Sequence, residues 1–134
     1  VADSAPWGSG AGSTFVENAL IPDLNAPTSL PLWPLLLARE VQLLVYNGNF
    51  DLICNHMGTD AYLQALQWPG SAAFLAAPRE PWRAGGSVGG WVKTGGNVTQ
   101  VVIANAGHMA PSDSPRAVLR MMERFLVGAP LAAM

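Results

Sequence analysis

The 134-residue sequence predicts an α/β fold built on an open sheet. Two compact β-prone runs, VQLLVY at 41–46 and VTQVVIA at 98–104, are each followed by a polar loop and then by a helical pattern. This alternation is typical of sheets with parallel neighbours, whose functional loops lie at the carboxyl ends of the strands. The first run lacks a polar alternation, which favours a strand covered on both faces.

The segment before the first strand is expected to be irregular over residues 1–29. Its first thirteen residues are rich in Gly, Ser and Ala, and prolines become frequent from Pro22 onward. Pro31 and Pro34 suit the first turn of a short helix over 31–40, because proline is tolerated where no backbone donor is needed.

The middle of the chain is predicted to hold a helix, a long excursion and a hairpin. Asn47-Gly48-Asn49 is a turn signal that ends the first strand, and Asn55 is a suitable cap for a helix over 56–67. His56, which opens that helix, is expected to be a solvated surface residue. Residues 68–82 are rich in Pro, Gly and Trp and indicate an excursion, and SVGGWVKTGGN at 87–97 indicates a hairpin.

The last helix is predicted to begin near Pro115, with Ser114 or Asp113 able to cap it. Apolar residues then recur at helical spacing, which indicates core packing. They are Val118, Leu119, Met122, Phe125 and Leu126.

The composition limits the classes of partner that the chain is expected to bind. Half of the residues are hydrophobic and only 12% are charged, against about 25% in ordinary soluble domains, so a partner surface is expected to be missing. The net charge is −2 with Lys and Arg scattered singly, which argues against nucleic acid. No apolar run approaches the roughly 20 residues that cross a bilayer, so no membrane partner is expected.

Asp51 and His108 each follow a strand closely, and they are the candidate catalytic residues. If the two strands are parallel neighbours, both side chains emerge at the same edge of the sheet. A carboxylate fixes the tautomer of an imidazole and stabilises the imidazolium, as proton transfer requires. In α/β-type hydrolases the order along the chain is Ser, Asp, His, so the serine is expected upstream of Asp51.

No serine of this chain fits that role. Residues 85–89 spell G-x-S-x-G around Ser87, but a nucleophile elbow needs a strand before it and a helix after it. This serine would also fall between Asp51 and His108 in the sequence. The chain is therefore predicted to hold two of the three members of a triad.

The two segments LLVYNGNFDLICNHMGT and VVIANAGHMAPSDSP closely resemble the C-terminal part of the serine carboxypeptidases. In that family G-x-x-D-x-I-C-N bears the catalytic aspartate and G-H-M-x-P-x-D-x-P bears the catalytic histidine. The matching residues are Gly48, Asp51, Ile53, Cys54 and Asn55 in the first, and Gly107, His108, Met109, Pro111, Asp113 and Pro115 in the second. The resemblance covers about residues 30–127, and Ser114 replaces a usual glutamine.

The resemblance implies that residues 1–134 form the C-terminal segment of one α/β-hydrolase domain, with the last strands of a mixed, mostly parallel sheet. The implied activity is release of C-terminal amino acids from peptides, with His108 as the base and Asp51 as its orienting partner. Met109 is implied to line the pocket for the leaving residue, and Cys54 lies near the site. No metal or cofactor is implied.

The family's nucleophile elbow, G-E-S-Y-[AG]-G, is absent from this sequence. The resemblance therefore implies either the small chain of a two-chain enzyme, whose partner is the large N-terminal chain of the same precursor, or a truncated product. In both cases the isolated chain is expected to be inactive. The family context is secretory, in a lysosome, a vacuole or outside the cell, so the sequon at Asn97 is expected to be glycosylated.

Two other functions remain open at the level of sequence. Carboxypeptidase-like acyltransferases and hydroxynitrile lyases share this scaffold, and the residues that separate them lie mostly upstream. A chain without a serine partner would instead be a non-catalytic binding subunit.

Overall fold

The computed structural model describes residues 11–24 and 28–131, and the chain divides into two units at residues 31 and 32. The first unit contains α1 (Ala11–Leu24), so the prediction of an irregular lead-in is wrong for these residues. The run TFVENALI at 14–21 contains neither Gly nor Pro, and nothing in it opposes a helix. The prediction for residues 1–10 lies outside the described residues.

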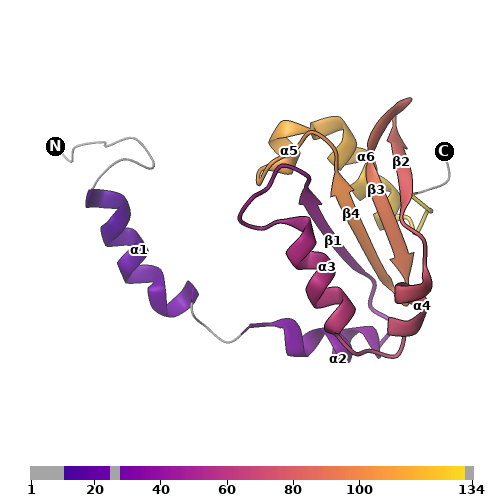
Figure 1. Cartoon of the computed structure of the whole chain (residues 1–134), viewed down its shortest axis with the longest axis horizontal. Helices are drawn as coiled ribbons and strands as arrows, with labels where there is room; N and C mark the ends of the chain where they lie inside the picture. Colours follow the sequence, from indigo (N-terminus) through magenta and orange to yellow (C-terminus); the bar gives the residue numbers. More distant parts are fainter. Residues whose placement is uncertain (1–10, 25–27, 132–134) are drawn as a thin grey trace. The chain divides into compact units, whose positions relative to one another are not determined.

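From residue 30 onward, helices flank β1 on both sides in the sequence, three consecutive strands follow, and two helices come last (Figure 1). In chain order they are η1 (Leu30–Leu32), α2 (Trp33–Leu37), β1 (Leu43–Gly48), α3 (His56–Ala65), α4 (Ser71–Ala76), β2 (Glu80–Ala84), β3 (Ser87–Gly95), β4 (Val98–Ile103), α5 (Ala110–Asp113) and α6 (Pro115–Leu126). No helix within the described ranges is long and apolar enough to cross a membrane.

The strands form one mixed sheet in the order β1-β4-β3-β2. The two strands predicted from sequence, β1 and β4, are parallel neighbours, with Gly48 paired to Ile103 at their carboxyl ends. The pairs β3–β4 and β2–β3 are antiparallel. The predicted α/β architecture is confirmed, and the antiparallel part comes from the segments that were predicted as an excursion and a hairpin.

Residues 68–97 are more regular than predicted. The expected excursion contains α4 and most of β2, and the expected hairpin over 87–97 is mainly the single strand β3. The hairpins lie at its two ends, at Gly85–Gly86 and at Gly96–Asn97, where all four residues have positive φ angles. Glycine and asparagine tolerate this conformation, so the Gly-rich pairs mark turns and the residues between them form the strand.

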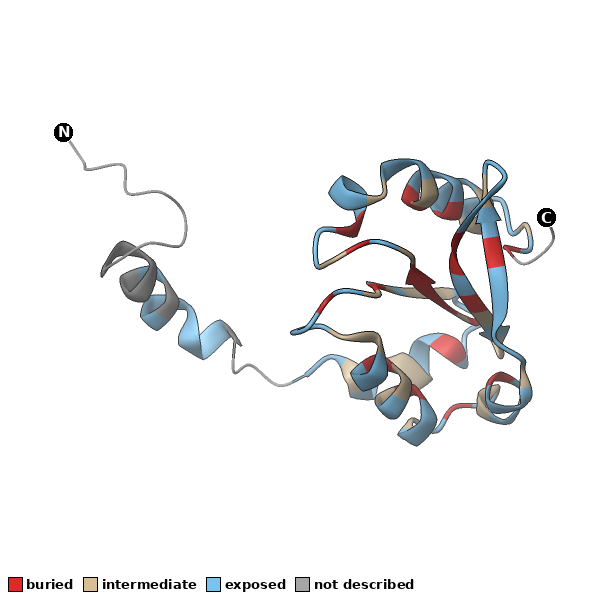
Figure 2. Ribbon diagram, turned by 45° about the horizontal axis from the view of Figure 1, so that its top comes forward, coloured by how far each residue is buried: buried red, intermediate tan, exposed pale blue. Residues whose placement is uncertain are grey.

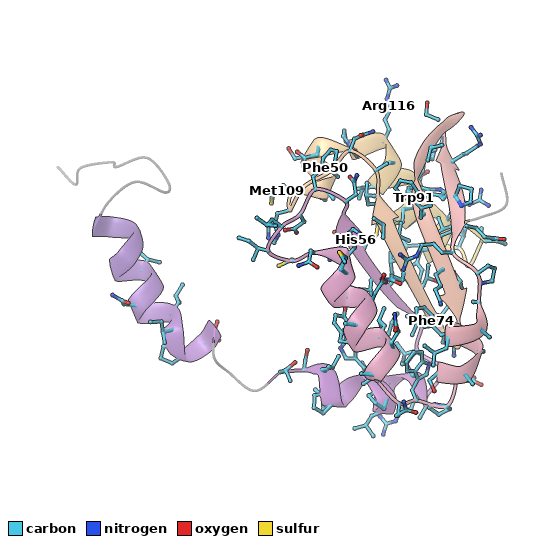
Figure 3. The ribbon with its side chains drawn as sticks, viewed as in Figure 1. Phe50, His56, Phe74, Trp91, Met109 and Arg116 are labelled. Atoms are coloured by element: carbon cyan, nitrogen blue, oxygen red, sulfur yellow. The ribbon has the colours of Figure 1, made fainter. Side chains whose placement is uncertain are left out.

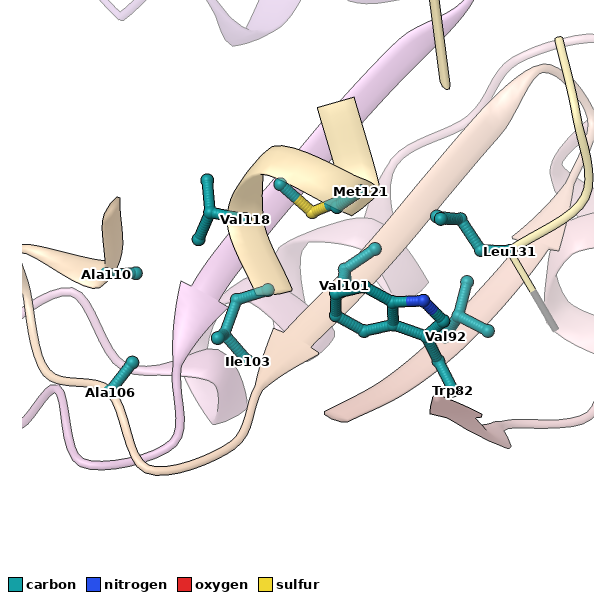
Figure 4. Packing of buried hydrophobic residues seen from close by; sticks show 9 residues of the cluster. All are labelled: Trp82, Val92, Val101, Ile103, Ala106, Ala110, Val118, Met121 and Leu131. Atoms are coloured by element: carbon teal, nitrogen blue, oxygen red, sulfur yellow. The ribbon is translucent and has the colours of Figure 1, made fainter. Parts of the chain in front are cut away.

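One face of the sheet packs against α6 (Figure 4). Trp82 of β2 and Val101 and Ile103 of β4 are fully buried there against Met121 of α6. The predicted apolar stripe of α6 is only partly in this core. Val118 is buried as expected, but the other predicted members are half-buried (Phe125) or exposed (Leu119, Met122 and Leu126).

The opposite face packs against α2, α3 and α4, and its buried residues are Leu37, Leu63, Trp68, Phe74 and Val98. The division follows from the alternation of β4, which directs Val98 to this face and Val101 and Ile103 to the other. Figure 2 shows that much of the outer surface of these helices is exposed. The two layers of helices leave the carboxyl ends of β1 and β4 as an open edge that carries the candidate site.

Candidate active site

The loops that follow β1 and β4 are bonded to each other along their backbones. Asn49 N–H donates to the carbonyl of Ile103 at 3.0 Å, and Phe50 N–H donates to the carbonyl of Ala106 at 2.9 Å. The Asn49 side chain adds a third link, because its Oδ1 accepts from Ala106 N–H at 3.3 Å. The parallel pairing therefore continues past the strands and brings the two loops into register.

Gly48 makes this approach possible. A Cβ atom at this position would lie 2.5 Å from the carbonyl carbon of Ala106, and closer still to the carbonyl oxygens of Ala106 and Gly107. No side chain larger than hydrogen fits between the two loops unless the backbone moves. The loops can meet only because this residue has no side chain.

Asp51 and His108, the predicted pair, meet at this edge although 57 positions separate them. The Oδ2 atom of Asp51 lies 2.9 Å from Nδ1 of His108. The other carboxylate oxygen, Oδ1, accepts from the backbone N–H groups of Ile53 at 3.1 Å and Cys54 at 2.9 Å. Both oxygens are engaged, so the carboxylate is fixed in one orientation toward the imidazole.

The surroundings of Asp51 favour its ionised form. Burial, which leaves the side chain 6% exposed, raises the pKa of Asp51. The hydrogen bond to His108, the backbone donor of Cys54, the charge of the imidazole and the donor of Ile53 together outweigh burial and hold the pKa below its usual 3.8. The group is a carboxylate at neutral pH and can accept the Nδ1 proton of His108.

His108 is held at one end and open at the other. Its side chain is 67% exposed, and within the described residues Nδ1 is the ring nitrogen that has a hydrogen-bond partner. With Nδ1–H donated to Asp51, the lone pair is on Nε2, which is the tautomer that a general base requires. The arrangement can accept a proton from a group that approaches from outside this chain.

Asp113 and Ser114 stabilise the loop that carries His108, here called the histidine loop, in ways that the sequence did not predict. The carboxylate of Asp113 accepts from Gly107 N–H at 2.7 Å, and the hydroxyl of Ser114 donates to the carbonyl of Ala104 at 3.0 Å. Neither side chain caps α6, so the predicted capping role is wrong. α5 precedes α6 and directs both side chains back to the histidine loop.

Cys54 lies beside the pair, as predicted. The residue is exposed, and one ligand atom from each of Asp51, Cys54 and His108 lies within 4.8 Å of the other two. These three residues are the group of His, Cys and acidic side chains in the described ranges whose spacing could hold a metal ion. Asp51 and His108 are already hydrogen-bonded to each other, which is the arrangement of an acid–base pair.

Large apolar side chains are exposed on the two loops that carry the pair and on the first turn of α3. Phe50 and Met109, labelled in Figure 3, are 67% and 64% exposed on the two loops. The other members of this apolar rim are Leu52, Ile53 and Met57, each more than two-thirds exposed. Large apolar side chains exposed together on these loops and on the first turn of α3 indicate a binding or contact surface.

Three other residues that the sequence pointed to are not part of the Asp51–His108 pair. Ser87 begins β3 after a Gly-Gly turn and is followed by strand, so its surroundings are not those of a nucleophile elbow. Asn97 lies at the opposite end of β4 from the candidate site. His56 is half-buried, and its buried Nδ1 atom has no hydrogen-bond partner among residues 11–24 and 28–131, so the prediction of a solvated histidine is wrong.

The structure also assigns roles to two asparagines that sequence reasoning left as a turn signal. Asn49 links the two loops, and Asn47 donates from Nδ2 to the carbonyl of Cys54 at 2.8 Å. Asn55 caps α3 as predicted, by accepting from Gly58 N–H at 2.8 Å. The doubled asparagine around Gly48 was the available signal, since such side chains bond to nearby backbone.

Comparison with known proteins gives a consistent result. The sequence profile of the family described as serine carboxypeptidase matches residues 13–128. The pheromone-processing carboxypeptidase KEX1 of Podospora anserina is 40% identical over 107 residues, which cover 75% of this chain and 18% of that protein. Serine carboxypeptidase 3 of Oryza sativa is 34% identical over 116 residues, which cover 87% of this chain and 23% of that protein.

A solved structure agrees with the fold. A KEX1 prohormone-processing carboxypeptidase from Saccharomyces cerevisiae superimposes with a TM-score of 0.66 at 30% identity, over 75% of this chain and 22% of that one. The chain thus spans about a fifth of the length of the relatives that it matches.

Proposed function

The chain belongs to the serine carboxypeptidase family, and from this premise we propose that it supplies the aspartate and histidine of a serine-type carboxypeptidase. The observation that carries the proposal is the 2.9 Å bond between Asp51 and Nδ1 of His108, with the rest of the imidazole exposed. We propose that the serine lies on an N-terminal chain of the same precursor. The absence of an elbow from these 134 residues and the greater length of the relatives support this division.

The chemistry of the proposed site is acyl transfer. The serine oxygen attacks the carbonyl carbon of the last peptide bond of the substrate while Nε2 of His108 takes up the hydroxyl proton. The C–N bond then breaks, and the imidazolium returns the proton to the departing amine of the C-terminal amino acid. Water hydrolyses the acyl-enzyme through the same base. Asp51, held as a carboxylate, keeps the imidazole oriented and stabilises its positive charge.

Cys54 and the residues of the apolar rim have two roles in this proposal. Met109 and Cys54 lie next to the pair and line the pocket for the leaving residue. Leu52, Ile53 and Met57 form the surface that the N-terminal chain covers. Burial of such residues stabilises association, since an aliphatic side chain gains about 1.5–3 kcal/mol on full burial.

We further propose that the intact protein acts in the secretory pathway, in a lysosome or vacuole, or after secretion. One relative, 39% identical over 89 residues, is named as the venom serine carboxypeptidase of Apis mellifera. The word venom in that name supports the proposal of secretion for this chain.

The test uses the full-length protein that carries this segment. The His108→Ala variant is expected to lose peptidase turnover, and the matched variant of the chain's other histidine, His56→Gln, is expected to keep it. A fluorophosphonate probe should label the N-terminal part and leave residues 1–134 unmodified. Near-normal turnover of His108→Ala, or labelling of Ser87, would contradict the proposed roles.

Product analysis separates the related chemistries. A carboxypeptidase releases a free amino acid from a peptide with a free C-terminal carboxylate and fails on the C-terminal amide. Transfer of the acyl group to an added alcohol as the sole reaction would identify an acyltransferase. Absence of both probe labelling and turnover in the intact protein would identify a non-catalytic subunit.

A further inference from the structure

The hairpin between β3 and β4 presents an asparagine in a form suited to modification. Gly96 and Asn97 are its two loop residues, with φ angles of +53° and +64°. This is the pattern of a type I′ turn, in which Asn and Gly are the favoured residues because both tolerate the left-handed region. Asn97 is exposed, and its side chain makes no hydrogen bond within the described part of the chain.

The backbone around Asn97 is anchored, although the described residues offer its side chain no hydrogen bond. The carbonyl of Asn97 accepts from Leu43 N–H at 2.9 Å, which ties the turn to the start of β1. Thr99, the third residue of the Asn-Val-Thr sequon, lies on β4 within 3.3 Å of the hydroxyl of Thr94 on β3. A group attached to Asn97 is therefore held in a defined place relative to the sheet.

A hollow of about 400 Å³ lies directly beside this turn. Gly95 and Gly96 line it together with Pro130 and Phe125, and Phe125 is half-buried. The volume is within the range of about 300–1,000 Å³ that small-molecule sites have. An aromatic ring with nearby hydroxyl and backbone groups suits a pyranose, whose C–H face packs on rings and whose hydroxyls form hydrogen bonds.

We propose that Asn97 carries an N-linked glycan whose first N-acetylglucosamine occupies this hollow against Phe125. The proposal rests on the secretory location proposed above. The donor is a lipid-pyrophosphate-linked oligosaccharide. Nδ2 of Asn97 bonds to C1 of the first sugar, the C1–O bond breaks, the lipid pyrophosphate leaves, and one Nδ2 proton passes to solvent through the transferase.

The position of Asn97 is compatible with the proposed activity. Asn97 precedes β4, whereas His108 follows the other end of that strand. Six residues of strand span about 20 Å, so the glycan lies well away from the acid–base pair. Loss of the glycan should leave kcat/KM unchanged, and this separates failure of the glycosylation proposal from failure of the proposed function.

The first experiment tests attachment, in the full-length protein secreted from eukaryotic cells. Tryptic peptide 94–116 holds the single sequon of these 134 residues, and it should carry a glycan mass that peptide N-glycosidase removes. The mass should disappear in Asn97→Gln and Thr99→Ala. It should remain in Thr94→Ala, which loses the same Thr–Thr contact but keeps the sequon. An unmodified peptide 94–116 in the secreted wild-type protein would overturn the proposal.

The second experiment tests whether the first sugar packs against Phe125. Endoglycosidase H trims a high-mannose glycan to one N-acetylglucosamine, and the trimmed protein should keep the Tm of the glycosylated form. The Asn97→Gln variant, given the same treatment, should melt about 1–2 °C lower. Phe125→Ala should remove that difference between the forms with and without the sugar. An equal difference in the Phe125→Ala background would show that the sugar does not lie against this ring.

Discussion

Gly48→Ala tests whether the close approach of the two loops positions the acid–base pair. The added Cβ atom would lie 2.5 Å from the carbonyl carbon of Ala106, whereas ordinary van der Waals contact begins near 3.4 Å. The histidine loop must therefore move away by roughly 1 Å. It cannot relax cheaply, because the atoms that meet the new methyl group belong to the backbone and are themselves tied to Asn49 and Phe50.

Both activity and stability should fall. Displacement of His108 by about 1 Å relative to Asp51 and to the incoming serine should lower kcat/KM by about 10²-fold. Overpacking at a buried backbone contact should reduce the free energy of unfolding by about 1–3 kcal/mol. The assay is hydrolysis of a blocked dipeptide by the full-length protein, with urea unfolding of the same preparation.

Gly58→Ala is the matched control. Its Cβ atom would meet Asn55 Oδ1 at 3.6 Å, an ordinary contact, in the first turn of α3. Activity should be unchanged, and stability should be unchanged or raised by up to about 1 kcal/mol, as for glycine replaced in a helix. If Gly48→Ala loses stability but keeps kcat/KM, the close approach does not position His108, and the reasoning fails.

Four further predictions concern the intact protein. Asp51→Asn should lower kcat by about 10⁴-fold with little change in KM, because the imidazole loses the partner that fixes its tautomer. A thiol reagent should inhibit peptidase activity by occupying the leaving-residue pocket, and Cys54→Ser should resist it. Met121→Ala should lower the free energy of unfolding in urea by about 2–5 kcal/mol, because Met121 is fully buried. Met122→Ala, at the exposed neighbouring position, should change it by less than about 0.5 kcal/mol. The pKa of Asp60 is lowered by its surroundings, so the wild-type protein should have a higher Tm than Asp60→Asn at pH values over 3.8. The difference in Tm between the two proteins should disappear as the pH falls below 3.8.

The sign of the Asp60 prediction follows from its surroundings. Burial raises the pKa of Asp60, but hydrogen bonds from Arg79 and Gln100 and the positive charges of Arg79 and His56 lower it further than burial raises it. A carboxyl whose pKa is lower in the folded state stabilises that state above its unfolded pKa, and protonation removes the gain. Equal Tm differences between the two proteins at pH 3 and pH 6 would refute this account.

The sequence predicted the parts of the fold whose signals are local. β1 begins as an apolar run and β4 is rich in β-branched residues, turn residues lie at their ends, and Asn55 precedes α3 as a cap must. The pair Asp51 and His108 was predictable because each residue follows one of these strands. Parallel neighbours bring the carboxyl ends of their strands together, whatever the distance along the chain.

The errors came from segments whose structure depends on distant contacts. β2 is a strand because it pairs with β3 and buries Trp82, and its sequence EPWRA gives no periodic signal. Asp113 and Ser114 have the chemistry of helix caps, yet their partners are Gly107 and the carbonyl of Ala104 in the preceding loop. A preference for capping states what a side chain can bond to, and tertiary structure decides which of the possible partners it meets.

The geometry of the pair depends finally on the register of β1 against β4. Gly48 is paired with Ile103, and a slip of one residue would shift Asp51 along the strand by about 3.3 Å and turn alternate side chains to the other face. A bond of 2.9 Å to His108 would not survive that shift. Leu44 of β1 packs in the same core as Val101 and Ile103 of β4, and a slip would turn it away from that core, so the core sets the acid–base geometry. Cavity-forming substitutions in this core should therefore lower kcat even where the protein stays folded.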